Sequence, residues 1–264
     1  MNFEKIIEER VNQKLKELRL KNSLEILEKL DINIELKKPL KYMILKRLRG
    51  DKEFYKISID KKPRAVVAFS GGVDSSTSAI IAKHIFNITA VSCYSKYIMT
   101  NEMKENAKNI AKKIGVELEF INVDLEEVYK GVVNGRFHPC GRCHKIIESA
   151  VIDYAKKINA EFVIFGDLLA FGYLSLYKDN EIFRFNLPSF FALTKDEERE
   201  ILKNNGIELK ASYGCLLLKI YHQHNKGYKF TIQRILREVR GRVVNEEEGF
   251  KNIIEILEIN KDRK

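Results

Sequence analysis

The stretch Ala65-Val66-Val67-Ala68-Phe69-Ser70-Gly71-Gly72-Val73-Asp74-Ser75-Ser76 decides the fold. Its apolar run predicts a buried strand, and the helical spacing that resumes after the glycines predicts a helix. Gly71 and Gly72 allow positive φ and close approach of an anion, and Ser70 and Ser75 add hydroxyl donors. The helix directs its unpaired N–H groups and the positive end of its dipole at the same point. The turn is therefore predicted to hold a pyrophosphate group.

The chain around this stretch alternates between the residue pattern of buried strands and that of amphipathic helices. Strands are expected at about 88–94, 117–123 and 161–166, and helices at about 74–86, 99–114 and 143–158. This order predicts an α/β fold with a doubly wound, mostly parallel, Rossmann-like sheet covered by helices on both faces. Ligands bind beyond the carboxyl ends of such strands, where the loop 70–75, Cys93, Asp124 and Asp167 are expected to lie.

Both ends of the chain are predicted to be helical additions. Residues 1 to about 30 form a helix whose apolar stripe, from Phe3 to Leu18, is expected to contact the core, and the following stretch to Lys62 is basic and irregular. A hairpin is expected at 173–185, a capping box opens a helix at Thr194, and two or three helices follow Gly214. The predicted domains are 1–62, 63–220 and 221–264.

Charge and composition restrict the class of protein. The 264 residues carry a net charge of +10, with ten basic and three acidic residues from Lys37 to Lys62 and seven basic and one acidic from Lys219 to Arg242. Such runs suit nucleic-acid phosphates, although solvated helix faces have the same composition. Neither a signal peptide nor a membrane-spanning run is present, so a cytoplasmic protein without a membrane partner is expected.

The segment Ser70-Gly71-Gly72-Val73-Asp74-Ser75 resembles the SGGxDS motif of the PP-loop ATP pyrophosphatases, and neither the Walker nor the dinucleotide-binding glycine pattern is present. The resemblance covers about residues 63–220 and implies an enzyme that transfers AMP from ATP and releases pyrophosphate. It implies an ATP site with Mg²⁺ in which Asp74 holds the magnesium or orients the turn, with a helix N-terminal charge as its alternative role. The implied ATP-binding residues are Ala68, Ser70, Gly71, Gly72, Asp74, Ser75, Tyr94 and Gly166. Asp167 is expected to position magnesium or the reacting carbonyl, with a helix cap as its alternative role.

The segment Phe137-His138-Pro139-Cys140-Gly141-Arg142-Cys143-His144 is the second informative stretch. Without an export signal its cysteines are expected to be reduced thiols or metal ligands, and the helix dipole and Arg142 are expected to favour the thiolates. A c-type haem site belongs outside the cytoplasm, and a zinc deaminase would need an upstream His-x-Glu. Structural zinc remains open, with Cys140, Cys143, Cys215 and one of the three histidines His138, His144 and His222 as ligands. Cys93 is expected in the core.

Some PP-loop enzymes that thiolate tRNA bind a 4Fe–4S cluster through three cysteines, and Cys140, Cys143 and Cys215 are similar in order and placement. The resemblance implies a tRNA sulfurtransferase that adenylates a base carbonyl and replaces its oxygen with sulfur, with Asp74, Asp167, Cys140 and Cys215 as catalytic residues. Sulfide or a carrier protein would supply the sulfur, and a homodimer is left open. The alternatives are a sulfur transferase or amidating ligase acting on a small molecule, with zinc on the cysteines, and a nucleotide-dependent RNA-binding regulator without turnover.

Overall fold

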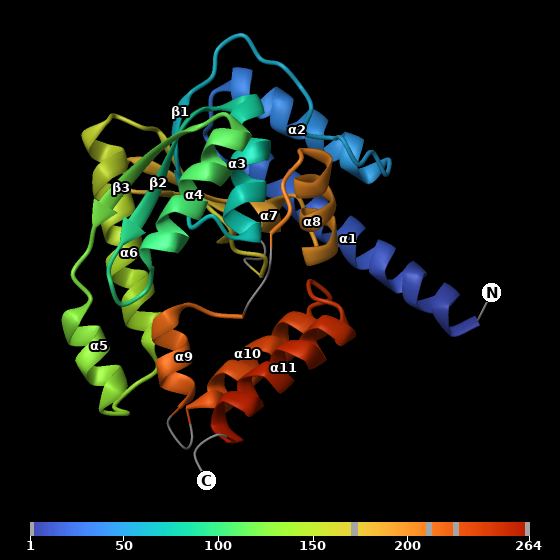
Figure 1. The fold of residues 1–264 in the computed structure, drawn as a ribbon. Coiled ribbons are helices and arrows are strands. Elements are labelled where there is room, and N and C mark those ends of the chain that lie inside the picture. The colour runs from blue at the N-terminus through green and yellow to red at the C-terminus, as the bar shows by residue number, and fades with distance from the viewer. Residues whose placement is uncertain (1–2, 170–173, 210–212, 224–226, 262–264) are drawn as a thin grey trace.

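The fold is built on one six-stranded sheet in the order β3-β2-β1-β4-β6-β5. The computed structural model describes residues 3–169, 174–209, 213–223 and 227–261, with side chains for 6–258 of these. Only β5 is antiparallel to its neighbour, so the mostly parallel α/β sheet is confirmed (Figure 1). The strands are β1 (Arg64–Ala68), β2 (Asn87–Tyr94), β3 (Glu117–Asn122), β4 (Phe162–Phe165), β5 (Leu176–Asp179) and β6 (Ile182–Asn186).

Side chains of β1 alternate between two cores, because successive residues of a strand point to opposite faces. Ala65 and Val67 face the larger cluster, which includes α3 (Val73–Ile85) and α4 (Asn101–Ile114). Val66 faces a second cluster with α6 (Pro139–Lys157). Helices therefore cover both faces, as the sequence predicts. The chain moves outward from β1 to β3 and returns to place β4 on the other side of β1, which is the switch point where such sheets bind ligands.

The N-terminal helices α1 (Phe3–Lys29) and α2 (Ile34–Leu48) pack on the larger cluster through Leu20, Leu27 and Leu40. Two sequence expectations are wrong here. The stretch after residue 30 is not irregular, because Asn33 caps α2 and this helix accommodates Pro39. The apolar stripe on the first half of α1 is not core: Ile7, Val11, Leu15 and Leu18 are exposed.

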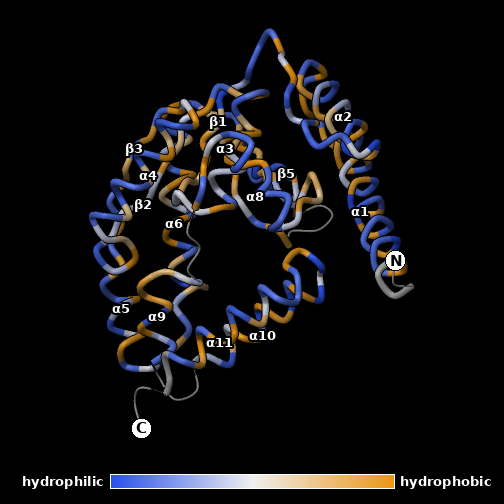
Figure 2. The backbone as a smooth tube through the Cα atoms, turned by 45° about the vertical axis from the view of Figure 1, so that its right-hand side comes forward, coloured by the Kyte–Doolittle hydropathy of each residue, from blue (hydrophilic) through white to orange (hydrophobic). Residues whose placement is uncertain are grey.

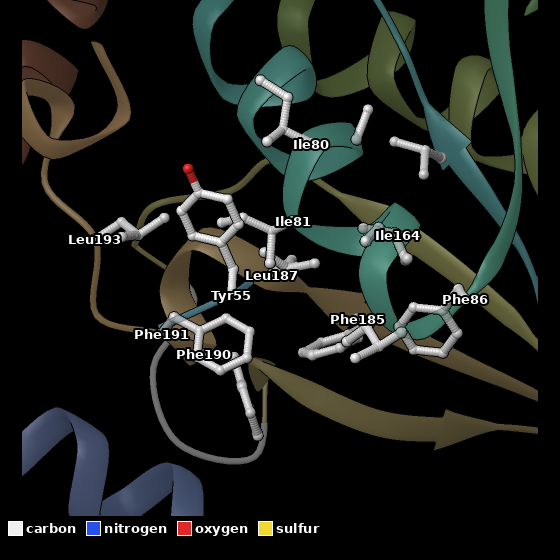
Figure 3. Packing of buried hydrophobic residues seen from close by; sticks show 14 of the residues in the cluster. Tyr55, Ile80, Ile81, Phe86, Ile164, Phe185, Leu187, Phe190, Phe191 and Leu193 are labelled. Atoms are coloured by element: carbon white, nitrogen blue, oxygen red, sulfur yellow. The ribbon is translucent and has the colours of Figure 1, made fainter. Parts of the chain in front are cut away.

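The predicted hairpin is formed by β5 and β6 and is followed by the short helix α7 (Leu187–Phe190). Phe185, Phe190 and Phe191 from this region lie against Phe86 and Tyr55 in the middle of the larger cluster (Figure 3). The predicted capping box at Thr194 is confirmed, and it opens α8 (Lys195–Asn204). α8 lies beside α3, the helix that follows the glycine loop (Figure 1).

A layer of helices lies beyond the carboxyl ends of the strands (Figures 1 and 2). It comprises α5 (Glu126–Val133), α9 (Leu216–His222), α10 (Tyr228–Arg240) and α11 (Glu246–Lys261), so the three predicted C-terminal helices are confirmed. A third apolar cluster joins α5, α6 and α9. In the part of the chain that the structure describes, none of the helices combines the length and apolarity needed to span a membrane.

Candidate functional site

The loop between β1 and α3 is closed by its own serines. The Ser70 N–H donates to Ser75 Oγ at 3.1 Å, the Gly72 N–H donates to Ser70 Oγ at 3.3 Å, and the two hydroxyl oxygens lie 3.2 Å apart. Gly71 has φ of +73°, and a Cβ there would lie 3.1 Å from the Cα of Ala107, so only glycine fits. The first N–H groups of α3 have no intrahelical acceptor and point at the space above this loop. The arrangement is suited to an anion.

The end of β4 lies directly against the same loop. A Cβ on Gly166 would lie 2.9 Å from the Asp74 Cβ and 3.2 Å from the Ser75 N. The two strand ends on either side of the switch point are therefore in contact, and the residue after Gly166 is held beside the first turn of α3. This is where the sequence predicts Gly166 to join the ATP site.

Asp167 follows Gly166 and is exposed to solvent, although protein atoms surround its carboxyl on several sides. Its backbone carbonyl accepts a hydrogen bond from the Ser189 hydroxyl. Burial raises the pKa of the Asp167 carboxyl, while the neighbouring His144 and Arg234 oppose that rise. Asp167 lines a cavity. Asp167 is therefore available to a bound group.

A lysine that the sequence motifs did not reveal is in contact with the loop. Lys195, the first residue of α8, forms an ion pair with Asp74 and lies 3.3 Å from Oε2 of the fully buried Glu198. Burial alone would lower the pKa of Lys195, but the carboxylates of Asp74 and Glu198 raise it. Burial and the charge of Asp74 raise the pKa of Glu198 well above its usual range, against the opposing effect of Lys195. Lys195 and Asp74 are thus the charged pair, and Glu198 is the neutral acid beside them.

The predicted metal-binding cysteines lie in one apolar cluster below the sheet. Cys140 and Cys143 come from the first turn of α6, and Cys215 is the N-cap residue of α9. Burial raises the pKa of Cys140 and Cys143, the latter to about 12, and the charge of Cys215 raises both. The three thiols are therefore close enough for their charges to interact, and a bound cation would relieve their repulsion. Cys93 is a residue of β2 and is buried in the core, as expected.

The cation next to Cys140 differs from the one expected. Arg234, from α10, lowers the pKa of Cys140, against the larger opposite effect of burial. Arg142 instead packs over the ring of Phe137, with its Cζ 3.9 Å from the ring centroid. Arg142 is not among the charges that shift the pKa of Cys140 or Cys143, so the expected effect of Arg142 on the thiols is not seen; its guanidinium instead covers Phe137, a neighbour in the same apolar cluster. The positive charge that lowers the pKa of Cys140 comes instead from Arg234 of α10.

A cavity of about 940 Å³ separates α6 from α10. One wall carries His138, Cys140, His144 and Asp167, and the other carries side chains of α10 including Arg234. The cavity is thus continuous from the thiol cluster to the residue beside the glycine loop. A substrate in it would reach both parts of the predicted site.

Hydrogen bonds attach α10 to the turn that carries Cys140. The Cys140 N–H donates to Nδ1 of His138, so this imidazole carries its proton on Nε2, which lies 3.3 Å from the Thr231 hydroxyl. Thr231 in turn lies 2.9 Å from Nε2 of His222. Burial lowers the pKa of His138, and burial with the charge of His138 lowers the pKa of His222 to about 4. Both rings are therefore neutral near pH 7, and Thr231 donates to His222.

Comparison with known proteins agrees with this geometry. Residues 64–167 match the family model for the queuosine biosynthesis protein QueC. An uncharacterized protein of Methanocaldococcus jannaschii is 87% identical over 97% of this chain and 99% of its own length. A tRNA-specific 2-thiouridylase MnmA of Fusobacterium nucleatum is 26% identical over 51% of this chain and 40% of its own. A glutamine-hydrolysing GMP synthase component from Pyrococcus horikoshii is 31% identical over 40% of this chain and 35% of its own.

The chain belongs to the PP-loop ATP pyrophosphatase superfamily. Membership of the PP-loop superfamily supports an ATP-dependent adenylating enzyme. The family match covers the strands and helices that form the PP-loop and both sides of its switch point, and it ends at Asp167. The cysteine Cys215 and the helix α10 lie outside it.

The structure brings together most of the residues that the sequence singled out for the PP-loop site. Ser70, Gly71, Gly72, Asp74 and Ser75 form the loop, with Gly166 against it and Ala68 at the end of the adjoining strand. Tyr94 ends β2, where its carbonyl accepts from the Val123 N–H and its ring lies 4.6 Å from Lys104 Nζ. Lys195 gives no signal in the sequence because its segment has the pattern of a capping box. The pairing of Lys195 with Asp74 depends on a contact between residues 121 positions apart.

Among the described residues, no three His, Cys, Asp or Glu side chains converge closely enough to enclose one metal ion. Cys140, Cys143 and Cys215 nevertheless border the same apolar cluster. Soft thiolates are ligands for zinc and for iron–sulfur clusters, so the chemistry of these donors fits either group.

Proposed function

We propose that this adenylating enzyme is a tRNA sulfurtransferase that converts a base carbonyl into a thiocarbonyl. The observation that carries the proposal is the cavity in which Cys140 and Asp167 share one wall, with Asp167 next to the PP-loop. An ATP-activated carbonyl and a sulfur source can meet there. The thiouridylase relative supports the choice of tRNA, since its name states that substrate.

The chain's residues have distinct roles in the first half-reaction. The N–H groups around Gly71 and Gly72 and the hydroxyls of Ser70 and Ser75 bind the β- and γ-phosphates, while Asp74 binds Mg²⁺. Lys195 neutralises phosphate charge when Asp74 turns to the metal. The base carbonyl oxygen attacks the α-phosphorus, the bond to the bridging oxygen breaks, and pyrophosphate leaves. Asp167 orients the carbonyl.

The second half-reaction replaces oxygen by sulfur. Cys140, Cys143 and Cys215 would hold a 4Fe–4S cluster, which supplies an iron position without a protein ligand and with affinity for sulfur. The sulfur of sulfide, delivered free or by a carrier protein, attacks the adenylated carbon. The carbon–oxygen bond then breaks and AMP leaves with the former carbonyl oxygen.

The test is the metal content of protein purified without oxygen, together with its pyrophosphate release. We expect about four irons with matching sulfide per chain, lost in Cys140→Ser and retained in Cys93→Ser, because Cys93 is a core residue of the same type. Pyrophosphate release from ATP should require tRNA and be lost in Asp74→Asn. One zinc without iron, or release that does not respond to tRNA, would overturn the proposal in favour of a small-molecule substrate.

A further inference from the structure

One face of α10 is turned to the cavity and carries no apolar core residue. Phe230, Gln233, Arg234, Arg237 and Arg240 recur at three- and four-residue steps, which places them along one side of a helix, and all five line the cavity. On the opposite side of the helix, Thr231 and Ile235 are buried. α10 therefore packs against the protein through one face, while its other face lies open toward the cavity wall that carries Cys140 and Asp167.

The arginines of this face differ in their partners. The Nε of Arg234 lies 3.1 Å from Oε1 of Glu238. The charge of Arg234 lowers the pKa of Cys140, against the larger effect of burial. Arg237 and Arg240 form no ion pair with a described carboxylate. They are one turn apart on the same face, so their guanidinium groups repel each other unless an anion lies between them. A guanidinium is also the side chain that binds phosphate oxygens in pairs.

The two ends of α10 lie at different parts of the site. Near its start, the Thr231 hydroxyl contacts His138, and the charge of Arg234 lowers the pKa of Cys140 against the larger effect of burial. At its end, a Cβ on Gly241 would lie 2.9 Å from Leu169, two residues after Asp167, and the Val243 carbonyl accepts from the Lys195 N–H at 2.8 Å. α10 thus runs from the thiol cluster toward the PP-loop (Figure 1).

An aromatic side chain stands at the thiol end of the row. Phe230 lines the cavity with 60% of its surface exposed, which is unusual for a phenylalanine in a helix that also has a buried face. A base can stack on such a ring irrespective of its sequence. Gln233, one turn further along, offers both a donor and an acceptor to a base edge.

We infer that α10 is a nucleotide-binding wall that receives one unpaired nucleotide of RNA. Its base stacks on Phe230 beside Cys140, and the backbone phosphates that flank it bind Arg237 and Arg240. The inference rests on the proposed function for its RNA substrate. It adds that the reacting base is unpaired and that its orientation is set by a helix outside the region matched to the family. Stacking on one side leaves the base edge facing Asp167.

The charge part of this inference is tested by salt dependence. A fluorescently labelled single-stranded RNA oligonucleotide is titrated at several salt concentrations with wild type, with Arg237→Gln/Arg240→Gln, and with Lys112→Gln/Lys113→Gln. The control pair removes the same charge from the exposed last turn of α4, at the other end of the sheet. Loss of two phosphate contacts should lower the slope of log affinity against log salt by about 1.4 in the α10 variant alone.

The stacking part is tested by Phe230→Ala and Phe230→Tyr. The alanine variant should bind the single strand about tenfold more weakly or worse with an unchanged salt slope, and tyrosine should retain binding. Duplex RNA of the same length should not show the difference. Equal slopes for the α10 and control variants, or equal loss on duplex, overturn the inference.

Two further readouts separate this inference from the proposed function. The affinity for ATP and the iron content should be unchanged in Arg237→Gln/Arg240→Gln, because neither side chain is placed on ATP or on the cluster. A weaker affinity for ATP would assign the arginines to the triphosphate and overturn the inference while leaving the sulfurtransferase intact. Wild-type protein that contains no iron would instead contradict the proposed function, while the measured RNA affinities would still test the inference about α10.

Discussion

Glu198 is a fully buried carboxyl beside a functional loop, and neither of its oxygens accepts a hydrogen bond from the described residues. Burying a charge in such a place is costly unless it is paired, and Lys195, the cation beside it, is already paired with Asp74. Protonated Glu198 leaves the three groups with no net charge. The loop therefore faces a neutral acid and a balanced ion pair before ATP arrives.

Substituting Glu198→Gln should make the free energy of unfolding less dependent on pH. The folded protein holds the Glu198 proton above the usual pKa, so this group favours folding at acid pH and its contribution is lost as pH rises through the raised pKa. The variant should thus gain stability over wild type at neutral pH and lose the advantage toward pH 4. Urea unfolding at a series of pH values measures this. A difference that does not vary with pH would contradict it.

Gly166→Ala should weaken ATP binding because its Cβ would lie 2.9 Å from the Asp74 Cβ and 3.1 Å from the Asp74 carbonyl carbon, so the loop backbone must move. We expect a cost of about 1–3 kcal/mol in the free energy of unfolding as well. Calorimetric titration with ATP measures the first effect. Gly141→Ala is the control, since a Cβ there meets nothing within 4 Å. Equal ATP affinity in the two variants would show that the contact is not needed.

The residues of the PP-loop itself are predictable from sequence because they are contiguous. Their spacing, a buried strand followed by two glycines and a helix N-terminus, is typical of a phosphate-binding turn. Lys195 and Arg234 are not, since each reaches the site from a helix far along the chain. Lys195 belongs to a segment whose local pattern is fully explained by a helix cap. A pattern that already has a local explanation gives no signal for a second role.

At the scale of elements, the hydrogen bonds from Cys140 through His138 and Thr231 to His222 link α10 to α6 and α9, which also share an apolar cluster. Each imidazole in this chain of bonds must be neutral, because His138 accepts from a backbone N–H and His222 accepts from a hydroxyl. Protonation would turn an acceptor into a donor and break the connection. The position of α10 is therefore sensitive to acid.

His222→Gln should remove part of the acid sensitivity of the fold. The pKa of His222 falls from 6.5 to about 4 on folding, so between these values the unfolded chain binds more protons and stability rises with pH. The full shift is worth about 3 kcal/mol at roughly 1.4 kcal/mol per unit. Glutamine still accepts from Thr231 but does not titrate. Unfolding measured from pH 4 to 7 should be flatter in the variant, and an unchanged slope would refute this.

Thr231→Val is the companion variant. It should lower stability at every pH by about 1–3 kcal/mol, because it leaves the buried Nε2 of His222 without its partner and removes the hydrogen bond of His138, while His222 still titrates.

Two element predictions failed for identifiable reasons. The sequence of α2 contains Pro39, which argues against a helix, but packing of Leu36, Leu40 and Met43 on the core outweighs it. The stripe on α1 has the spacing of a buried face, yet periodicity shows only that the residues share a side. Whether that side is covered depends on how far the helix extends beyond its neighbours.

At the scale of the whole molecule, Arg47 connects the N-terminal helices to the rest. Its guanidinium is buried, donates to the carbonyls of Phe191 and Ala192, and is paired with Glu197. Although burial alone would raise it, Arg47 and Lys16 lower the pKa of Glu197 to about 2. The predicted boundary at residue 62 therefore separates parts that share both an apolar cluster and an ion-pair network.

Arg47→Met should destabilise the protein by about 1–3 kcal/mol, because it leaves the carbonyls of Phe191 and Ala192 without their donor while Glu197 keeps only Lys16 as its cation. Lys52→Met is the matched control, since its ion pair with Glu200 is exposed and worth at most about 1 kcal/mol. Thermal and urea unfolding compare them. Similar losses in the two variants would mean that the buried pair is no stronger than a surface one.

The order of strands and helices along the chain, and hence the fold class, was predictable because periodicity is a local property. It was not predictable that residues 228–240 form the far wall of the cavity, because no local pattern specifies which distant surface a helix contacts. The same limit explains why the cysteines could be grouped by family resemblance but not by spacing.

The serine hydrogen bonds that close the loop have a consequence for the thermodynamics of nucleotide binding. Ser70, Ser75 and the left-handed Gly71 already fix the loop in the absence of ATP. Binding therefore requires little loss of backbone conformational entropy at residues 70–76. The Ser70 and Gly72 amide hydrogens, which donate to serine oxygens, should exchange more slowly in the free protein than the first amides of α3. Nucleotide should slow the latter by contact rather than by ordering a disordered segment.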